Sequence, residues 1–463
     1  MSAAPNNPYA REPEPEHGHD HDHEHDASDS KPLLDSAHTP AQGSDTHLNT
    51  PNDPDYRYSY TDENYNYYPS GPTQSQAKLD DPFAPPSKAE DYARQTQYEN
   101  LDYAEPFPGP TAKSTPVMMK QPNMFQRYFG LYPLEQRIQD KKRGVGVQKH
   151  PIVCYVLSAA MLGVLIFELV TNSKAQGSPF SFKPVVNPML GPSSSALIQM
   201  GARFPPCMKN VTDVPITTLL PCLNDTANPA TELCSLENIC GFGGFHDETP
   251  DQWFRFITPI FLHAGLIHYL LNMLAQLTAS AQIEREMGSL PFLILYSAAG
   301  IFGNVLGGNF ALLGSPSVGA SGAIFGTIAV AWIDLFAHWR YTFRPGRKLA
   351  FMIVELVIGV AIGFIPYVDN FAHLGGLAMG LLVAMALYPI ISPSNRHRII
   401  VIVLRLIAVP LAIVMMVVLI RNFYKSDPSA ACSWCRYLSC IPTSSNNHCK
   451  GTGLTTSSGS SSI

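Results

Sequence analysis

The chain has 463 residues, a net charge of −6 at pH 7 and a mean hydropathy of zero. Only 15% of its residues are charged, against about 25% in soluble globular domains. This composition argues against an ordinary soluble protein, and no nucleic-acid partner is expected. Residues 1–145 are polar, whereas apolar runs long enough to cross a lipid bilayer dominate from Pro151 onward. The sequence therefore predicts an all-α polytopic membrane protein with a disordered N-terminal tail.

The predicted tail, residues 1–145, lacks hydrophobic periodicity and is dense in Pro, Asp and Ser, which is typical of disorder. Five histidines alternate with acids and Gly18 over 17–25. A metal-binding tract and a solvated polar tail both fit, and the low-complexity composition favours the solvated tail. Residues 29–34 have the form of an acidic dileucine sorting signal, so cytoplasmic sorting adaptors are candidate partners of the tail.

Basic residues gather immediately before the first apolar run, which covers Pro151 to Val170. By the positive-inside rule this flank lies in the cytoplasm, so the first span delivers residues 172–252 to the lumen or exterior. That loop contains N-glycosylation sequons at Asn210 and Asn224 and four of the nine cysteines. Charge, sequons and cysteines thus predict one orientation, in a Golgi, endosomal or plasma membrane of the secretory pathway.

Six further apolar runs follow, so seven spans are predicted: 151–170, 254–281, 290–313, 321–336, 349–366, 370–391 and 399–420. The short loops that this count places in the cytoplasm are basic, and the opposite short loops carry neither Lys nor Arg. An odd number of spans puts the tail 422–463 in the lumen. Its four cysteines and those of loop 172–252 predict disulfides, with three pairings open in each set.

Ser321 and His373 each lie near the start of a separate apolar run. If both runs enter the bilayer from the same side, the two side chains lie at the same depth, as a nucleophile and its base would. Taken singly, Ser321 also fits a helix N-cap and His373 a polar packing residue. Small residues four apart allow the close helix approach that a Ser-His hydrogen bond requires. They are Gly303 and Gly307, Gly322 and Gly326, and Gly376 and Gly380.

The second predicted span carries three polar side chains in one half. His268 and Asn272 are four residues apart and share a helix face, whereas His263 should point about 140° away. Polar residues in a span usually face a bundle interior or a water-filled cavity. Interhelical hydrogen bonding is the alternative. A zinc site fails on spacing, because the span has no His-Glu-x-x-His and Glu284 lies near its far end.

Asp334 and Glu355 are two acids within the predicted spans. A proton or ion pathway is one interpretation, and interior pairing near Arg340 is the one we favour. A transporter would carry paired charges at the bilayer midplane and an internal repeat. The sequence has neither feature, so the two acids do not redirect the interpretation toward transport.

Taken together, these motifs resemble the rhomboid intramembrane serine proteases. The matching residues are His263-x4-His268-x3-Asn272, Glu284-x3-Gly288, Gly319-x-Ser321-Gly322 and Ala372-His373-x2-Gly376-x3-Gly380. The resemblance covers about Trp253 to Gly380 and extends to the seven-span layout, which is similar to the eukaryotic secretory-pathway type. It implies a rhomboid-type six-helix core plus one C-terminal transmembrane helix, within a transmembrane domain at 146–421. The family's Trp-Arg pair is split here as Trp253-Phe254-Arg255.

By this resemblance Ser321 is the nucleophile and His373 the general base, without a carboxylate. Asn272, His268 and the backbone N–H of Ser321 would form the oxyanion hole, and His263 would structure or hydrate the cavity. The implied function is intramembrane proteolysis of single-span membrane proteins within the lipid bilayer, with no metal or cofactor. The alternative is a catalytically silent rhomboid-like protein that binds and traffics membrane clients.

Overall fold

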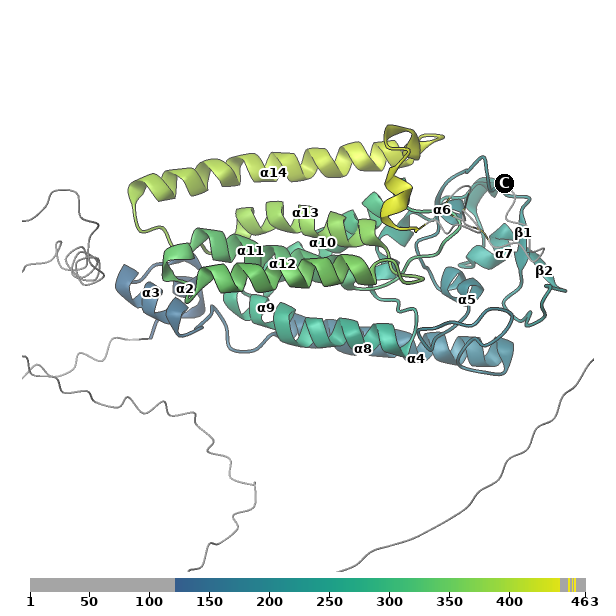
Figure 1. The fold of residues 1–463 in the computed structure, drawn as a ribbon, viewed down its shortest axis with the longest axis horizontal. Helices are drawn as coiled ribbons and strands as arrows, with labels where there is room; N and C mark the ends of the chain where they lie inside the picture. Colours follow the sequence, from purple (N-terminus) through teal and green to yellow (C-terminus); the bar gives the residue numbers. More distant parts are fainter. Residues whose placement is uncertain (1–120, 442–448, 450–451, 453, 455–463) are drawn as a thin grey trace, which may run out of the picture. The chain divides into compact units, whose positions relative to one another are not determined.

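A computed structural model describes residues 121–441 together with residues 449, 452 and 454. The histidine tract 17–25 and the dileucine pattern 29–34 lie outside the described residues. The described part is mostly helical, with a short antiparallel hairpin of β1 (Leu219–Pro221) and β2 (Leu233–Ser235). Figure 1 shows long helices side by side, with α2 and α3 at one end and α5, α6, α7 and the hairpin at the other. The bounds of these short helices are α2 (Met124–Phe129), α3 (Leu134–Lys142), α5 (Ser194–Gln199), α6 (Pro205–Met208) and α7 (Leu236–Cys240).

The last part of the predicted disordered tail is helical, so the boundary at residue 145 is wrong. A capping box begins α2: the Asn123 side chain accepts from the Gln126 N–H, and the Gln126 side chain accepts from the Asn123 N–H. In α3, the ammonium group of Lys141 lies 2.6 Å from the Asp334 carboxylate and 3.1 Å from that of Glu286. A local cap and a tertiary ion pair therefore order this segment despite its polar composition.

Asp334 is paired inside the bundle near Arg340, as the favoured interpretation expected, but its partners are other residues. Its carboxylate lies 2.6 Å from Lys141, 3.3 Å from Lys348 and 2.9 Å from Nδ1 of His338. Lys141 belongs to α3, in the segment whose composition predicted disorder. Lys141 was therefore missed as a partner of Asp334 because the helix that carries it was missed.

Helices lie at all seven positions that the sequence predicted as spans. Four of them, α4, α10, α13 and α14, are long and apolar enough to cross a membrane, and α11 is a shorter apolar helix. The seven are α4 (Ile152–Gln176), α8 (Leu266–Ala275), α10 (Ser289–Phe310), α11 (Ser321–Ala337), α12 (Pro345–Ile362), α13 (Asn370–Leu387) and α14 (Asn395–Phe423). The described structure thus agrees with a polytopic helical membrane protein.

The second predicted span, 254–281, starts too early. Residues 253–260 form two 3₁₀ turns, η2 (Trp253–Phe256) and η3 (Thr258–Ile260), and regular helix begins only at Leu266. Gly265 has φ +156°, and a Cβ there would lie 2.6 Å from the Leu190 carbonyl oxygen, so the chain passes close to the preceding loop. The helix continues through a π turn, η4 (Gln276–Ser280), into α9 (Ala281–Met287). His263 therefore precedes the helix, and its expected 140° offset on a helix face is wrong.

Helix α13 packs against both α10 and α11, which also contact each other. A Cβ at Gly376 of α13 would meet the carbonyl oxygen of Gly322 on α11. One at Gly380 would lie 2.5 Å from the Cα of Gly326. The backbones approach where no side chain stands, which is how helices pack closely in lipid. The predicted close contact between the two helices is confirmed.

Both predicted sets of cysteines are disulfide-bonded, each within its own set. The segment 177–265, called the α4–α8 loop below, contains Cys207–Cys240 and Cys222–Cys234. After α14 come two 3₁₀ turns, η6 (Pro428–Ala431) and η7 (Cys435–Leu438), with Cys432–Cys435 and Cys440–Cys449. The tail returns to the bundle, because the carbonyl of Thr452 accepts from the Gly314 N–H at 2.7 Å.

Candidate active site

Ser321 is the first residue of α11, and His373 lies in the first turn of α13. Their helices pack against one another, and Ser321 Oγ lies 2.8 Å from His373 Nε2, within hydrogen-bonding distance. Ala320 occupies the N-cap position of α11 and makes no side-chain cap bond. The serine hydroxyl is therefore engaged with the histidine rather than with the helix N-terminus, which contradicts the N-cap interpretation.

The imidazole ring of His373 is buried and held on two sides. Nδ1 lies 3.1 Å from the backbone carbonyl oxygen of Gly359 on α12. The ring also stacks on Phe325 of α11, with centroids 4.3 Å apart and planes 10° from parallel. Because a carbonyl oxygen only accepts, Nδ1 carries the hydrogen and Nε2 presents its lone pair to Ser321. A backbone carbonyl thus takes the orienting place that a carboxylate has in a Ser-His-Asp triad.

Two buried side chains of α8 converge on the loop before Ser321. A Cβ added at Gly319 would lie 2.9 Å from Nε2 of His268 and 3.5 Å from Nδ2 of Asn272. The Ala264 N–H donates to His268 Nδ1 at 3.3 Å, which leaves the Nε2 hydrogen to donate toward Gly319. Asn272 Nδ2 is buried without a hydrogen-bond partner among the described residues. The arrangement offers N–H donors beside the serine, and only glycine at 319 leaves room for them.

His263 lies behind His268 rather than at Ser321, with the two ring centroids 5.5 Å apart in an edge-to-face arrangement. Its backbone N–H donates at 3.0 Å to the carboxylate of Glu168, a fully buried residue of α4. Glu168 is not among the residues predicted from sequence, although an acid inside the first apolar run is a signal that identifies it. Across the described residues, no group of three or more His, Cys, Asp or Glu side chains is placed to hold a metal ion.

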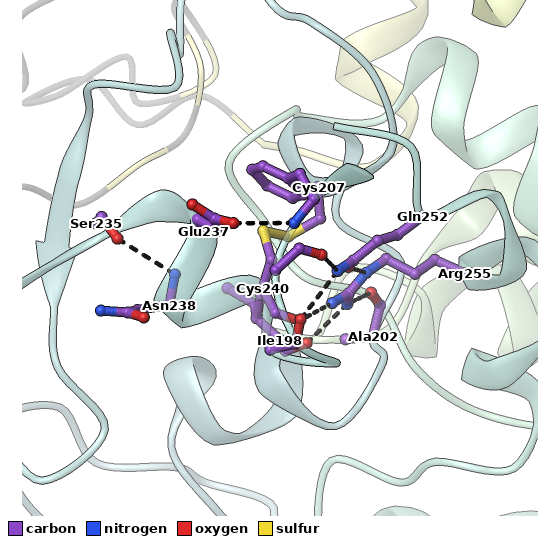
Figure 2. Close-up of a disulfide and its surroundings, with 12 residues drawn as sticks. Ile198, Ala202, Cys207, Ser235, Glu237, Asn238, Cys240, Gln252 and Arg255 are labelled. Atoms are coloured by element: carbon purple, nitrogen blue, oxygen red, sulfur yellow. Dashed lines mark hydrogen bonds between the residues drawn. A yellow bond between two sulfur atoms is a disulfide. The ribbon is translucent and has the colours of Figure 1, made fainter. Parts of the chain in front are cut away.

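The split sequence Trp253-Phe254-Arg255 puts its two ends in opposite environments. Trp253 is 60% exposed, whereas Arg255 is fully buried against the α4–α8 loop beside the Cys207–Cys240 disulfide (Figure 2). The guanidinium of Arg255 donates to the Gln252 side chain at 2.7 Å and to three backbone carbonyls. These carbonyls belong to Ile198 at 2.7 Å, Ala202 at 2.7 Å and Cys240 at 2.5 Å. Arg255 therefore organises the loop, and its hydrogen bonds go to loop residues rather than to the Ser-His pair.

Glu284 of the Glu284-x3-Gly288 motif caps another helix. Its carboxylate accepts from the backbone N–H of Val153 at 2.9 Å and of Cys154 at 2.8 Å, in the first turn of α4. A carboxylate is favourable at a helix N-terminus, where N–H groups have no intrahelical acceptor. Glu284 thus fixes the start of α4 against α9. Hydropathy alone does not predict this contact.

Comparison with known proteins places these residues in a family. The Rhomboid domain model matches residues 250–390. Rhomboid-type serine protease 2 of Emericella nidulans is 35% identical over 416 residues, which cover 74% of this chain and 82% of the relative. RHOMBOID-like protein 1 of Arabidopsis thaliana is 32% identical over 287 residues, covering 57% and 63%. Inactive rhomboid protein 1 of Rattus norvegicus is 31% identical over 224 residues, covering 47% of this chain and 25% of the relative.

The chain is a multi-pass membrane protein, and it belongs to the rhomboid family. The family predicted from the sequence motifs is thereby confirmed. The matched region, 250–390, contains Ser321, His373, Asn272, His268 and His263. The relatives include both a serine protease and an inactive protein, so family membership alone does not decide catalysis.

Proposed function

We propose that this chain is an intramembrane serine endopeptidase that cleaves single-span membrane proteins. The observation that carries the proposal is the 2.8 Å contact between Ser321 Oγ and His373 Nε2, with the Nδ1 hydrogen donated to the Gly359 carbonyl. A serine hydroxyl becomes an effective nucleophile only when a base accepts its proton. The hydrogen on Nδ1 fixes the tautomer in which Nε2 has a free lone pair and can act as a base. A histidine that served packing alone would not need this tautomer to be fixed.

The mechanism follows from this geometry. His373 Nε2 accepts the hydroxyl proton as Ser321 Oγ attacks the scissile carbonyl carbon, which becomes a tetrahedral oxyanion. Three N–H groups would donate to this oxyanion: Asn272 Nδ2, His268 Nε2 and the Ser321 backbone N–H. The backbone N–H is available because Ser321 is the first residue of α11, so this group has no acceptor within the helix. The protonated His373 then gives its proton to the leaving amine, and an acyl-enzyme remains. A water molecule, deprotonated by His373, attacks the ester and releases the carboxyl product and free Ser321.

We infer seven spans, with the N-terminus in the cytoplasm and both disulfide-bonded regions facing the lumen of a secretory-pathway membrane. The support is that the hairpin with α5–α7 and the basic helix α3 lie at opposite ends of the bundle (Figure 1). Thiol mass-tagging of native membranes before and after reduction tests the orientation. Free thiols at Cys207, Cys222, Cys234 and Cys240 would contradict it, because these cysteines form disulfides only in an oxidising compartment.

The N-terminal tail is proposed to serve trafficking, through sorting adaptors that read residues 29–34. Residues 1–110 would lie on the cytoplasmic side, opposite the Ser-His pair, and deleting them should leave reporter cleavage by purified protein unchanged. Loss of turnover by a correctly folded deletion variant would overturn this assignment.

A catalytically silent client-binding protein is the second candidate, favoured only by the inactive relatives at about 31% identity. Labelling of purified protein with a fluorophosphonate probe separates the two candidates. We expect a covalent adduct at Ser321, and we expect Ser321→Ala and His373→Ala to abolish cleavage of a single-span reporter. If equal amounts of folded Ser321→Ala protein still cleave the reporter, the protease proposal is wrong.

A further inference from the structure

Arg203, in the α4–α8 loop, is bonded through its backbone to the loop that leads to the candidate nucleophile. Its N–H donates to the Ser317 carbonyl at 3.0 Å, and the Ser317 N–H donates to the Arg203 carbonyl at 3.1 Å. Ser317 lies four residues before Ser321. The reciprocal pair is an isolated β-bridge, and it fixes the path of the chain into α11.

The side chain of Arg203 reaches the other half of the site. Its Nη1 lies 2.5 Å from Oδ2 of Asp369, and the two side chains are only 2% and 3% exposed. Asp369 is the N-cap of α13: its Oδ1 accepts from the Phe371 N–H at 2.9 Å, and its carbonyl accepts from the His373 N–H at 3.2 Å. One residue therefore connects the loop before Ser321 with the first turn that contains His373.

The bundle leaves room for this ion pair. A Cβ added at Gly307 of α10 would meet both Nη1 of Arg203 and Oδ2 of Asp369. Gly307 is also one of the small residues that sequence analysis assigned to helix packing. The structure gives it a second role, because any larger residue there would push the two charged groups apart.

The C-terminal tail closes over the same carboxylate. The hydroxyl of Ser439 donates to Oδ1 of Asp369 at 3.1 Å, and Asn370 Nδ2 donates to the carbonyl of Leu438 at 2.7 Å. Ser439 directly precedes Cys440, which is bonded to Cys449. The tail, the α4–α8 loop and α13 thus meet at Asp369.

We propose that Arg203 and Asp369 are positioning residues, a clasp that sets the distance between Ser321 and His373; this inference rests on the proposed protease function. A buried ion pair is weak evidence for stability, since replacing both partners by apolar residues of similar size often leaves the stability of a fold unchanged or raises it. This pair is placed where geometry matters. It joins the segments before the two reacting side chains, and a displacement of about 1 Å in such a site costs roughly 100-fold in rate.

The test separates positioning from folding through paired neutral substitutions. Arg203→Gln alone leaves the Asp369 carboxylate buried and unpaired, so both thermal stability and kcat should fall. Adding Asp369→Asn removes that charge and keeps an acceptor for the Phe371 N–H, so stability should recover. The rate should not recover, because the charged contact is still absent: we expect kcat about 100-fold below wild type, with KM nearly unchanged. Arg203→Lys keeps one charged contact and should restore part of the rate.

Lys209→Gln is the matched control. Lys209 is another buried cation of the same loop, but it donates to the carbonyls of Phe423 and Lys425, at and just beyond the end of α14, which carries neither reacting residue. Its loss should lower stability without lowering kcat.

The rate of fluorophosphonate labelling at Ser321 supplies a readout free of substrate binding, and it should fall with kcat in both Arg203→Gln variants. If kcat and labelling recover together with stability in the double variant, the pair is structural and the clasp is overturned. If wild-type protein is not labelled at Ser321, the proposed function falls and the clasp falls with it. The two failures are therefore distinguishable.

Discussion

The α11–α13 contact and the α4–α8 loop both hold the candidate site, but by different physics. The helix contact is backbone against backbone at Gly322 and Gly376, where an added Cβ has no space. The loop is held by two disulfides and by Arg255, whose guanidinium satisfies three buried carbonyls. Lipid offers helices no hydrophobic driving force, so close packing must hold them together. In the loop, carbonyls removed from water need a donor.

This difference predicts opposite sensitivities. The helix contact should fail when atoms are added, and the loop should fail when a donor or a covalent bond is removed. The hydrogen bond between Ser321 and His373 depends directly on the helix contact, and it depends on the loop only through the residues that the loop presents. Additions to the helix contact are therefore expected to have the larger effect on rate.

The largest effect is expected for Gly376→Val. The new side chain would meet the Gly322 carbonyl and push α13 from α11, which separates the serine from its base, so the rate should fall by more than about 1000-fold, beyond the loss of one oxyanion donor. Gly163→Val is the control, because Gly163 lies on the exposed face of α4 and a Cβ there meets none of the described residues within 4 Å. Reporter cleavage and labelling at Ser321 measure both variants. Normal labelling of Gly376→Val would show that the helix contact does not set the geometry.

Asn272→Ala should come next, with a loss of about 100- to 1000-fold in kcat, because it deletes one donor to the oxyanion. Its melting temperature should change little, since Asn272 Nδ2 has no partner to lose among the described residues. Gln276→Ala is the matched control one turn further on. The Gln276 amide is bonded to Ser158 at 2.9 Å and to the Tyr296 hydroxyl at 2.5 Å, so its loss should lower stability and spare kcat. The reverse pattern would remove Asn272 from the oxyanion hole.

Much of the site could be predicted because it follows local sequence rules. The positions of Ser321 and His373 at the starts of two apolar runs gave their shared depth, and the four-residue glycine spacing gave the close contact of their helices. The i, i+4 spacing of His268 and Asn272 put both on one face of α8, where both are buried. Each of these inferences uses the period of a helix or the length of a span, and none of them depends on tertiary detail.

What sequence could not supply depends on contacts between distant segments. Arg203 and Asp369 are 166 residues apart and carry no shared pattern. The Gly359 carbonyl that orients His373 is a backbone group, which any residue has. The break at Gly265 was missed because hydropathy stays high across 254–281, although a glycine and Pro259 inside that run were available signals. The order of α3 depends on Lys141 meeting acids far along the chain.

The loop itself is tested by removing the Cys207–Cys240 disulfide, which closes a separation of 33 residues. Replacing both cysteines by serine should cost about 2–5 kcal/mol of stability, because the unfolded chain gains freedom and two buried hydroxyls replace sulfur. The Cys432–Cys435 disulfide is the control: its separation is only three residues, so its removal should cost less. Thermal unfolding of both double-serine variants gives the ranking. Equal losses would show that chain entropy does not explain how the loop is held.

The smallest effect concerns Lys209 and pH. Burial lowers the pKa of Lys209 to about 8 from an ordinary value of 10.5. Between about pH 8 and pH 10.5, Lys209 keeps its proton in the unfolded chain but has released it in the folded chain. The contribution of Lys209 to stability therefore rises with pH across this range. Below about pH 8 both states are protonated and the cost of burying the charge is fully present.

The melting temperature of wild type minus that of Lys209→Met should therefore increase as the pH is raised from about 8 toward 10.5. The difference is informative because all other titrating groups are common to the two proteins. Lys425→Met is the comparison variant, since the Lys425 side chain is exposed and its removal uncovers no buried contact. A difference that stays flat across this window would mean that the Lys209 ammonium reaches water. The loop would then be held at this point by an exposed cation. The contrast between a loop held by buried donors and a helix contact formed at glycines would be weaker at this position.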